Sequence, residues 1–228
     1  MARLTWHGHA TFTLETDSGR RVLFDPFLND NPKSDITVED VADLDYVLCS
    51  HGHFDHFADA IEVCRRTGAT LVGTFELVAF AQSKGVEHAH GMNVGGGHHF
   101  DFGYLKLTPA VHSGTVDGDD EGRYTTLAHG FLIDMNGKRL YHAGDTALIM
   151  EMQLLKGQVD VALLPIGDNF TMGPGDAARA VGFIEPGVVI PMHYDTWDLI
   201  AQDPEEFRAL VGGAADVVVL KPGQSYEF

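Results

Sequence analysis

Hydrophobic and polar positions follow two distinct periods along the chain. Residues 11–16, "TFTLET", alternate apolar and polar side chains, which predicts a strand with one buried face. Other short runs rich in β-branched and aromatic residues are bounded by turn residues, and they predict further strands. These runs cover residues 21–25, 45–50, 69–74, 104–112, 130–135, 138–145, 159–167 and 187–194. Apolar residues recur with helical spacing, and predict helices, over residues 57–68, 75–85, 175–185 and 203–213.

The order of these elements repeats once. Residues 12–26, "FTLETDSGRRVLFDP", and residues 131–145, "FLIDMNGKRLYHAGD", each combine a strand, a glycine turn, a basic pair and a second strand. In both halves a buried strand that runs into a loop comes next, followed by a helix that leads into another strand. We therefore expect an α/β fold, a four-layer αββα sandwich of two similar β/α halves. Chance similarity between β/α units is the alternative explanation.

The length and composition are those of an ordinary globular protein. The chain has 228 residues, of which 44% are hydrophobic and 21% are charged, and we expect a single domain over residues 1–228. No apolar run reaches the ~18 residues of a membrane-spanning helix, and the start lacks the apolar core of a signal peptide. Cys49 and Cys64 belong to no C-x-x-C pair. We expect free buried thiols in a reducing, cytoplasmic environment.

The charge balance limits the classes of partner. The formal net charge is -18, from 33 acidic and 15 basic residues, and the basic residues are scattered rather than clustered. Such a surface repels phosphate backbones and anionic lipid headgroups. We therefore expect a small-molecule partner, with no nucleic-acid partner and no membrane partner. A homo-oligomer is compatible with the sequence.

One segment concentrates the chemistry. Residues 50–56 read "SHGHFDH" and follow the buried strand predicted over residues 45–50. In an extended segment, residues i and i+2 point the same way, so His51 and His53 can bind one ion together. Asp55 and His56 follow after a turn and can face a second ion. Imidazole and carboxylate ligands suit Zn, Mn or Fe, whereas a chance histidine cluster or a structural metal site is the alternative.

Two ions need more ligands than this segment supplies. Three further candidates stand at the ends of predicted strands, namely His112 in "LTPAVHSG", Asp145 in "RLYHAGDT" and His193 in "VVIPMHYDT". Each would be weak evidence alone, because a histidine beside a strand commonly has a structural role. Together with the cluster they give seven ligands, which fits two ions with room for solvent.

These residues also carry a family resemblance. The motif "HGHFDH" with a later His, Asp and His resembles the metallo-β-lactamase superfamily. Within it, the chain resembles the lactonase-like branch of metal-dependent hydrolases, which includes ascorbate-6-phosphate lactonase and many bacterial proteins. The stretches that carry the resemblance span residues 6–196, and are "WHGHATF", "FDPFL", "SHGHFDH", "TPAVHS", "YHAGDT", "PIGDNFTMG" and "VVIPMHYDT".

The resemblance implies a role for each ligand. It assigns the first metal ion to His51, His53 and His112. It assigns the second ion to Asp55, His56 and His193, and it makes Asp145 the bridge between the two. In such a centre, two divalent ions ~3.5–4 Å apart activate a water as hydroxide at neutral pH. We expect that hydroxide to attack a cyclic ester (a lactone) or a phosphodiester.

A few residues are candidates for roles other than metal binding. Asp55 can also orient the nucleophile, and His9 is a candidate for contact with the substrate or with a metal ligand, a structural histidine being the alternative. Asp25 in "FDPFL" is expected to hydrogen-bond a metal-bound histidine or to cap a turn. The loop 113–126 follows His112 directly, so we expect it to control substrate choice. Arg123 in this loop either pairs with an anionic substrate group or is an ordinary surface arginine.

Other functions remain in view. A thioester hydrolase of the glyoxalase II kind would use the same ligands, and a non-catalytic metal-binding protein would hold the ions without turnover. A di-iron protein of the flavodiiron kind would need a flavin domain that this length cannot hold. The sequence assigns no role to His7 or Tyr194, and it does not identify the substrate or the native metal.

Overall fold

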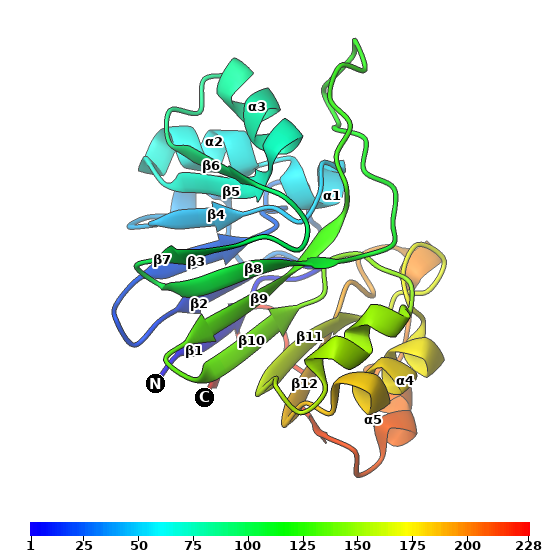
Figure 1. Ribbon diagram of the computed structural model, residues 1–228. Coiled ribbons are helices and arrows are strands. Elements are labelled where there is room, and N and C mark those ends of the chain that lie inside the picture. The colour runs from blue at the N-terminus through cyan, green and yellow to red at the C-terminus, as the bar shows by residue number, and fades with distance from the viewer. The chain divides into compact units, whose positions relative to one another are not determined.

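Two seven-stranded β-sheets form the framework of the computed structural model, which describes residues 1–228. Each sheet lies in its own compact unit (Figure 1). The first unit comprises Met1–Gly96, Ser113–Leu127 and Lys221–Phe228, and the second comprises Gly97–His112 and Ala128–Leu220. None of the helices combines the length and the apolar character that a membrane crossing requires.

The first unit carries a mixed sheet with the strand order β14-β1-β2-β3-β4-β5-β6. Its strands are β1 (Arg3–Trp6), β2 (Phe12–Glu15), β3 (Arg21–Phe24), β4 (Tyr46–Leu48), β5 (Thr70–Thr74), β6 (Ala89–Met92) and β14 (Ser225–Glu227). Its helices are η1 (Val38–Asp40), α1 (Phe54–Phe57), α2 (Ala60–Thr67) and α3 (Phe75–Ser83). Helices α2 and α3 pack against β5, and α3 also contacts β6 (Figure 1).

The second unit carries a sheet of matching design, with the order β13-β12-β11-β10-β9-β8-β7. Its strands are β7 (Gly97–Phe100), β8 (Gly103–Pro109), β9 (His129–Met135), β10 (Lys138–His142), β11 (Val161–Pro165), β12 (Val188–Met192) and β13 (Asp216–Val217). Its helices are η2 (Met150–Leu155), α4 (Pro174–Ile184), η3 (Asp198–Ile200) and α5 (Pro204–Val211). Helix α4 packs with α5 and with η2.

The predicted repeat is present in the pairing of the strands. In the first unit, β1-β2 and β2-β3 are antiparallel, whereas β3-β4, β4-β5 and β5-β6 are parallel. In the second, β8-β9 and β9-β10 are antiparallel, whereas β10-β11, β11-β12 and β12-β13 are parallel. The two halves therefore share one topology, and the basic-pair hairpins matched in the sequence are the equivalent hairpins β2-β3 and β9-β10.

Apolar side chains fix the helices of the first unit to its sheet. Leu23, Val47 and Leu71 project from β3, β4 and β5 into a buried cluster that also receives Val63 of α2 and Leu77 of α3. Burial of each such side chain is worth about 1.5–3 kcal/mol relative to exposure. The packing holds the carboxyl ends of these strands, and the loops that follow them, in a defined position.

Candidate metal centre

Strand direction decides where the chemistry gathers in each unit. Strands β3 and β4 are parallel, and β1 is antiparallel to β2, which is antiparallel to β3, so all of β1, β3 and β4 end at one edge. Candidate residues follow each of these ends, namely His9 after β1, Asp25 after β3 and His51 after β4. Loops at the carboxyl ends of parallel strands are the usual place for sites in α/β folds.

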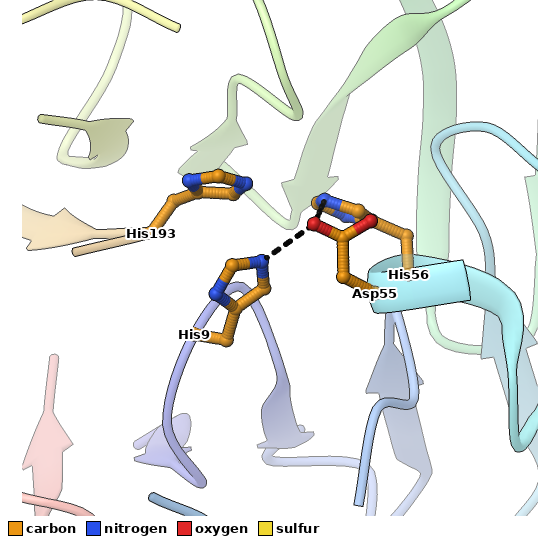
Figure 2. Close-up of side chains that lie close together, drawn as sticks. All are labelled: His9, Asp55, His56 and His193. Carbon is orange, nitrogen blue, oxygen red and sulfur yellow. Dashed lines mark hydrogen bonds and ion pairs between the residues drawn. The ribbon is translucent and has the colours of Figure 1, made fainter. Parts of the chain in front are cut away.

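The segment after β4 brings four candidate ligands together. The Nε2 atom of His51 lies 3.0 Å from Nδ1 of His53. Asp55 and His56 both come from α1, and Oδ2 of Asp55 lies 3.9 Å from Nε2 of His56. His9 completes this group, because its Nε2 atom lies 3.2 Å from Oδ2 of Asp55 (Figure 2). One donor atom each of His9, Asp55 and His56 lies within 4.8 Å of the others.

Asp25 and Ser50 hold the far side of two of these imidazoles. Oδ2 of Asp25 lies 2.8 Å from Nδ1 of His56 and accepts the hydroxyl of Ser50 at 2.7 Å. The Ser50 hydroxyl also lies 3.0 Å from Nδ1 of His51. The Nε2 atoms of His51 and His56 are therefore the ones that point towards the other candidate ligands. A carboxylate behind a histidine is the usual arrangement that orients metal-binding imidazole. The predicted hydrogen bond between Asp25 and a histidine is present, while metal binding by His56 stays a prediction.

The loop 113–127 is hydrogen-bonded to residues 50–56, the segment that carries four candidate ligands and is called the ligand segment below. The backbone N–H of Asp117 donates to the carbonyl of Gly52 at 2.8 Å, and its carboxylate accepts the N–H of Phe54 at 2.6 Å. A Cβ atom at Gly52 would lie 2.8 Å from Cα of Val116, closer than side chains tolerate. Glycine between His51 and His53 is thus required for this contact. The sequence did not identify Asp117 or Ser50 as a site residue. Each supports the site only by hydrogen bonds to residues that the folded structure brings next to it.

The second unit collects the three remaining candidates. Strand β9 is antiparallel to both β8 and β10, whereas β10, β11 and β12 are parallel. The carboxyl ends of β8, β10, β11 and β12 therefore lie at one edge of the sheet. Nε2 of His193 lies 3.0 Å from Oδ2 of Asp145, and Nε2 of His112 lies 3.6 Å from the same oxygen. Asp145 and His193 are almost fully buried. One carboxylate oxygen thus faces two imidazoles.

Two local features position the side chains of this second group. The Thr146 hydroxyl accepts the N–H of Val111 at 3.1 Å, which joins the residues next to Asp145 and His112. His193 adopts a φ of 56°, a left-handed conformation that is unusual for a residue other than glycine. A Cβ at Gly167 would lie 2.2 Å from the His193 carbonyl oxygen, so only glycine fits there. Such strain is typical of residues held in place for function.

The remaining polar candidates have other environments. His7 is buried, and its ring nitrogens lie 2.8 Å from Asp35 and 2.8 Å from Thr13, away from the ligand segment. Arg123 pairs with Glu121 at 3.0 Å with both side chains well exposed, as expected of a surface arginine. Burial, followed by the charges of Asp195 and Glu205, raises the pKa of Tyr194 to about 12, so this phenol stays protonated at neutral pH.

The donor chemistry fits a divalent transition metal. The first unit brings together His9, His51, His53, Asp55 and His56. The second brings together His112, Asp145 and His193. Imidazole and carboxylate donors of this kind suit Zn, Mn or Fe. Cys49 and Cys64 are buried in the apolar cluster of the first unit, away from these donors, so no thiolate takes part.

The chain is similar to a known protein family and to curated proteins of the same length. A family model described as the β-lactamase superfamily domain matches residues 20–194. A UPF0173 metal-dependent hydrolase of Staphylococcus aureus (strain JH9) is 44% identical over 231 residues, which cover 99% of this chain and 100% of that protein.

Solved structures give the same picture. Igni18, a metallo hydrolase from the archaeon Ignicoccus hospitalis KIN4/I, has a TM-score of 0.89 and 38% identity, with 100% of this chain and 99% of that chain covered. An isothiocyanate hydrolase from Delia radicum gut bacteria has a TM-score of 0.78 over 99% of each chain. Its identity is 19%, so that likeness shows the fold alone.

Proposed function

The chain belongs to the β-lactamase superfamily, and from this premise we propose that it is a binuclear metal-dependent hydrolase of cyclic esters or phosphodiesters. The expected fold class, an α/β fold of the metallo-β-lactamase type with two mixed sheets flanked by helices, is confirmed. The relatives that cover the whole chain are named metal-dependent hydrolases, which supports hydrolysis as the reaction type.

The observation that carries the proposal is the support behind the ligand segment. Asp25 is fully buried, and it engages Nδ1 of His56 directly and Nδ1 of His51 through Ser50. A fully buried carboxylate needs strong hydrogen-bond partners to offset its desolvation. Here those partners are imidazoles whose opposite nitrogens point at other donors. In a chance histidine cluster, a buried carboxylate that orients two of the imidazole rings would not be expected.

The proposed distribution of ligands follows from the family resemblance. We assign one ion to His51, His53 and His112. We assign the other to Asp55, His56 and His193, with Asp145 as the bridging ligand. A carboxylate would suit this bridging role because its oxygens offer several lone pairs, whereas a neutral imidazole offers one.

When bound, two divalent ions would activate a water and polarise the oxygen of the scissile group. The protein's own part is proton handling at Asp55 and His9. Hydrolysis adds the hydroxyl of water to the acyl or phosphoryl centre, breaks the bond to the leaving oxygen and delivers a proton to that oxygen. Oδ2 of Asp55 and Nε2 of His9, 3.2 Å apart, form a pair that can accept this proton and pass it on.

The substrate proposal combines the family branch with the charge. A lactonase-like activity, of the kind found in relatives of ascorbate-6-phosphate lactonase, is the first candidate, and a phosphodiesterase is the second. We propose a small-molecule substrate rather than a nucleic acid, because the formal net charge of -18 disfavours a polyanion. The two free, buried thiols support a cytoplasmic location as part of the same proposal.

A substrate panel tests the proposal. Protein loaded with Zn²⁺ or Mn²⁺ is assayed on lactones of several ring sizes, on bis(p-nitrophenyl) phosphate and on a glutathione thioester. We expect turnover of a lactone or of the phosphodiester that is lost on chelation and restored by adding the metal. Turnover confined to the thioester would indicate the glyoxalase II kind of hydrolase. Full metal occupancy without turnover of any of the three would indicate a metal-binding protein.

A further inference from the structure

A groove lies beside the ligand segment in the first unit and has no part in the proposed metal binding. It has a volume of about 370 Å³, and its floor is apolar, made by Phe54 and Phe57 of α1, Ile61 of α2 and Phe80 of α3. Arg65 of α2 and Lys84, which caps the C-terminus of α3, also line it. The volume is within the usual range for small-molecule pockets, and the lining of apolar surface with a few polar groups is typical of them.

Phe54 connects this groove to the candidate ligands. It stands between His53 and Asp55 in the chain and remains 50% exposed, although an aromatic side chain of this size is usually buried. Its ring meets Phe27 edge to face at 5.7 Å between centroids, and the ring of Phe27 meets that of His9 in the same way at 5.7 Å. An apolar group that rests on Phe54 would therefore extend from the ligand segment into the groove.

Positive charge defines the rest of the groove. The Nζ atom of Lys84 lies 5.2 Å from the centre of the Phe80 ring. Arg65 reaches the same region, because its Nε atom would lie 3.9 Å from a Cβ placed on Gly85, the residue after Lys84. Arg65 and Lys84 form no ion pair with a carboxylate, although the chain has 33 acidic residues.

One acidic residue also borders the groove. The carboxylate of Asp117 accepts the N–H of Phe54 and is engaged in holding α1. Two cations against one carboxylate leave the lining with a positive balance in a strongly acidic protein. An occupant with a negative end is favoured there, because its charge would meet two cations that pair with no carboxylate of the chain.

We propose that this groove is a specificity site that binds the acyl part of the substrate, an apolar chain or ring that ends in a carboxylate. The inference rests on the proposed hydrolytic function and identifies its substrate class. The chain or ring would lie on Phe54, Phe57 and Phe80, and the carboxylate would pair with Arg65 and Lys84. At about 30 Å³ for each water-sized group, the volume holds roughly a dozen such groups, which is enough for an acyl chain of about eight carbons together with its carbonyl and carboxylate oxygens.

Steady-state kinetics test the charge preference. The probes are the mono-p-nitrophenyl ester of suberic acid, which has a terminal carboxylate, and p-nitrophenyl octanoate, which has the same chain length without it. Lys84→Gln and Arg65→Gln are each expected to raise KM for the suberate at least tenfold, and to leave its kcat and both constants for the octanoate within about twofold. Arg66→Gln is the matched control, since Arg66 is exposed on the same helix but does not line the groove. Equal effects on the two esters, or an equal effect of the control, would overturn the proposal.

Binding without turnover separates this inference from the proposed function. Calorimetric titration compares hexanoate with hexanamide, which has the same chain and no charge. The wild-type protein and Arg66→Gln should bind hexanoate at least tenfold more tightly, and a double variant with Arg65→Gln and Lys84→Gln should lose that preference. A preference that persists in the double variant would place the carboxylate on another part of the protein and overturn the groove. Loss of the preference in the double variant, with a wild-type protein that turns over none of the lactone, phosphodiester and thioester substrates, would uphold the groove and reject the hydrolase.

Discussion

Nδ1 of His56 lies 2.8 Å from Oδ2 of Asp25, and both side chains are completely buried. The same carboxylate accepts the N–H of Ser50 at 2.6 Å and its hydroxyl at 2.7 Å. Asp25 therefore fixes the orientation of His56, and through Ser50 that of His51, by contacts within the folded chain.

Asp25→Asn should weaken metal binding while the fold is kept. The amide retains the size of the carboxylate, but it replaces one accepting oxygen with a donor that cannot satisfy both His56 and Ser50. Loss of a hydrogen bond behind a metal ligand typically lowers metal affinity about 10–100-fold. Competition with a metallochromic chelator measures the affinity, and circular dichroism checks the fold.

Asp35→Asn provides the matched control. Asp35 lies 2.8 Å from Nδ1 of His7, the same separation as in the Asp25–His56 pair, but His7 is not a proposed ligand. Metal affinity should stay within about twofold of wild type in this variant. Equal losses in Asp25→Asn and Asp35→Asn would show that the effect is one of general stability.

His9→Gln should lower kcat and leave the metal content unchanged. His9 is fully buried, with Nε2 3.2 Å from Asp55, where it can share the proton that the reaction transfers. Loss of a general acid or base lowers the rate by about 10²–10⁴. The checks are turnover on the best substrate and elemental analysis of the same sample, with His7→Gln as the control. A parallel fall in metal content would instead make His9 a ligand, which its position among Asp55 and His56 permits.

The sequence predicted which candidate residues lie close together, but not the residues that hydrogen-bond to them. The histidine spacing in "HGHFDH" and the strand ends before His112, Asp145 and His193 were sufficient, because strand direction sends those ends to one edge of each sheet. Ser50 and Asp117 were missed, since a single serine or loop aspartate has no period or motif. Asp117 meets Phe54 across 63 residues of chain, a separation that local patterns do not reveal.

The sequence likewise predicted some elements of the fold and missed others. Strands β2 to β5 and β8 to β12 were predicted, because alternating or continuous apolar runs mark them in the sequence. Strand β1 and the edge strands β6, β7, β13 and β14 were missed, since they are short and the four edge strands contain few buried side chains. Helix α5 begins at the predicted place, with the Asp203 side chain accepting the N–H of Glu205. The prediction that residues 1–228 form a single domain stays a prediction.

Asp117→Ala should destabilise the segment that carries the ligands. The carboxylate satisfies the Phe54 N–H at the start of α1, as an N-cap residue would, and loss of such a cap lowers the free energy of unfolding by about 1 kcal/mol. Urea denaturation measures this change, and Asp120→Ala, exposed in the same loop, is the control. An unchanged midpoint in Asp117→Ala would show that this hydrogen bond contributes nothing.

Both thiols should resist labelling in the folded protein. Burial raises the pKa of Cys64 to about 12 and raises that of Cys49 well above its usual range, so neither forms the reactive thiolate at pH 8. Titration with a disulfide reagent should label no cysteine in native protein and both after denaturation. Rapid labelling of one thiol in native protein would contradict the buried positions in the apolar cluster.

The number of metal ions that one chain holds tests the central claim most directly. Wild-type protein and Asp145→Ala are dialysed to saturation against Zn²⁺ or Mn²⁺ and analysed for metal and protein. We expect two ions per wild-type chain. Asp145→Ala should hold fewer, with kcat lowered on the order of 10²–10³, because the proposed bridging carboxylate would serve both ions. A folded wild-type protein that saturates at one ion, or an Asp145→Ala variant that keeps two ions and normal turnover, would contradict the claim.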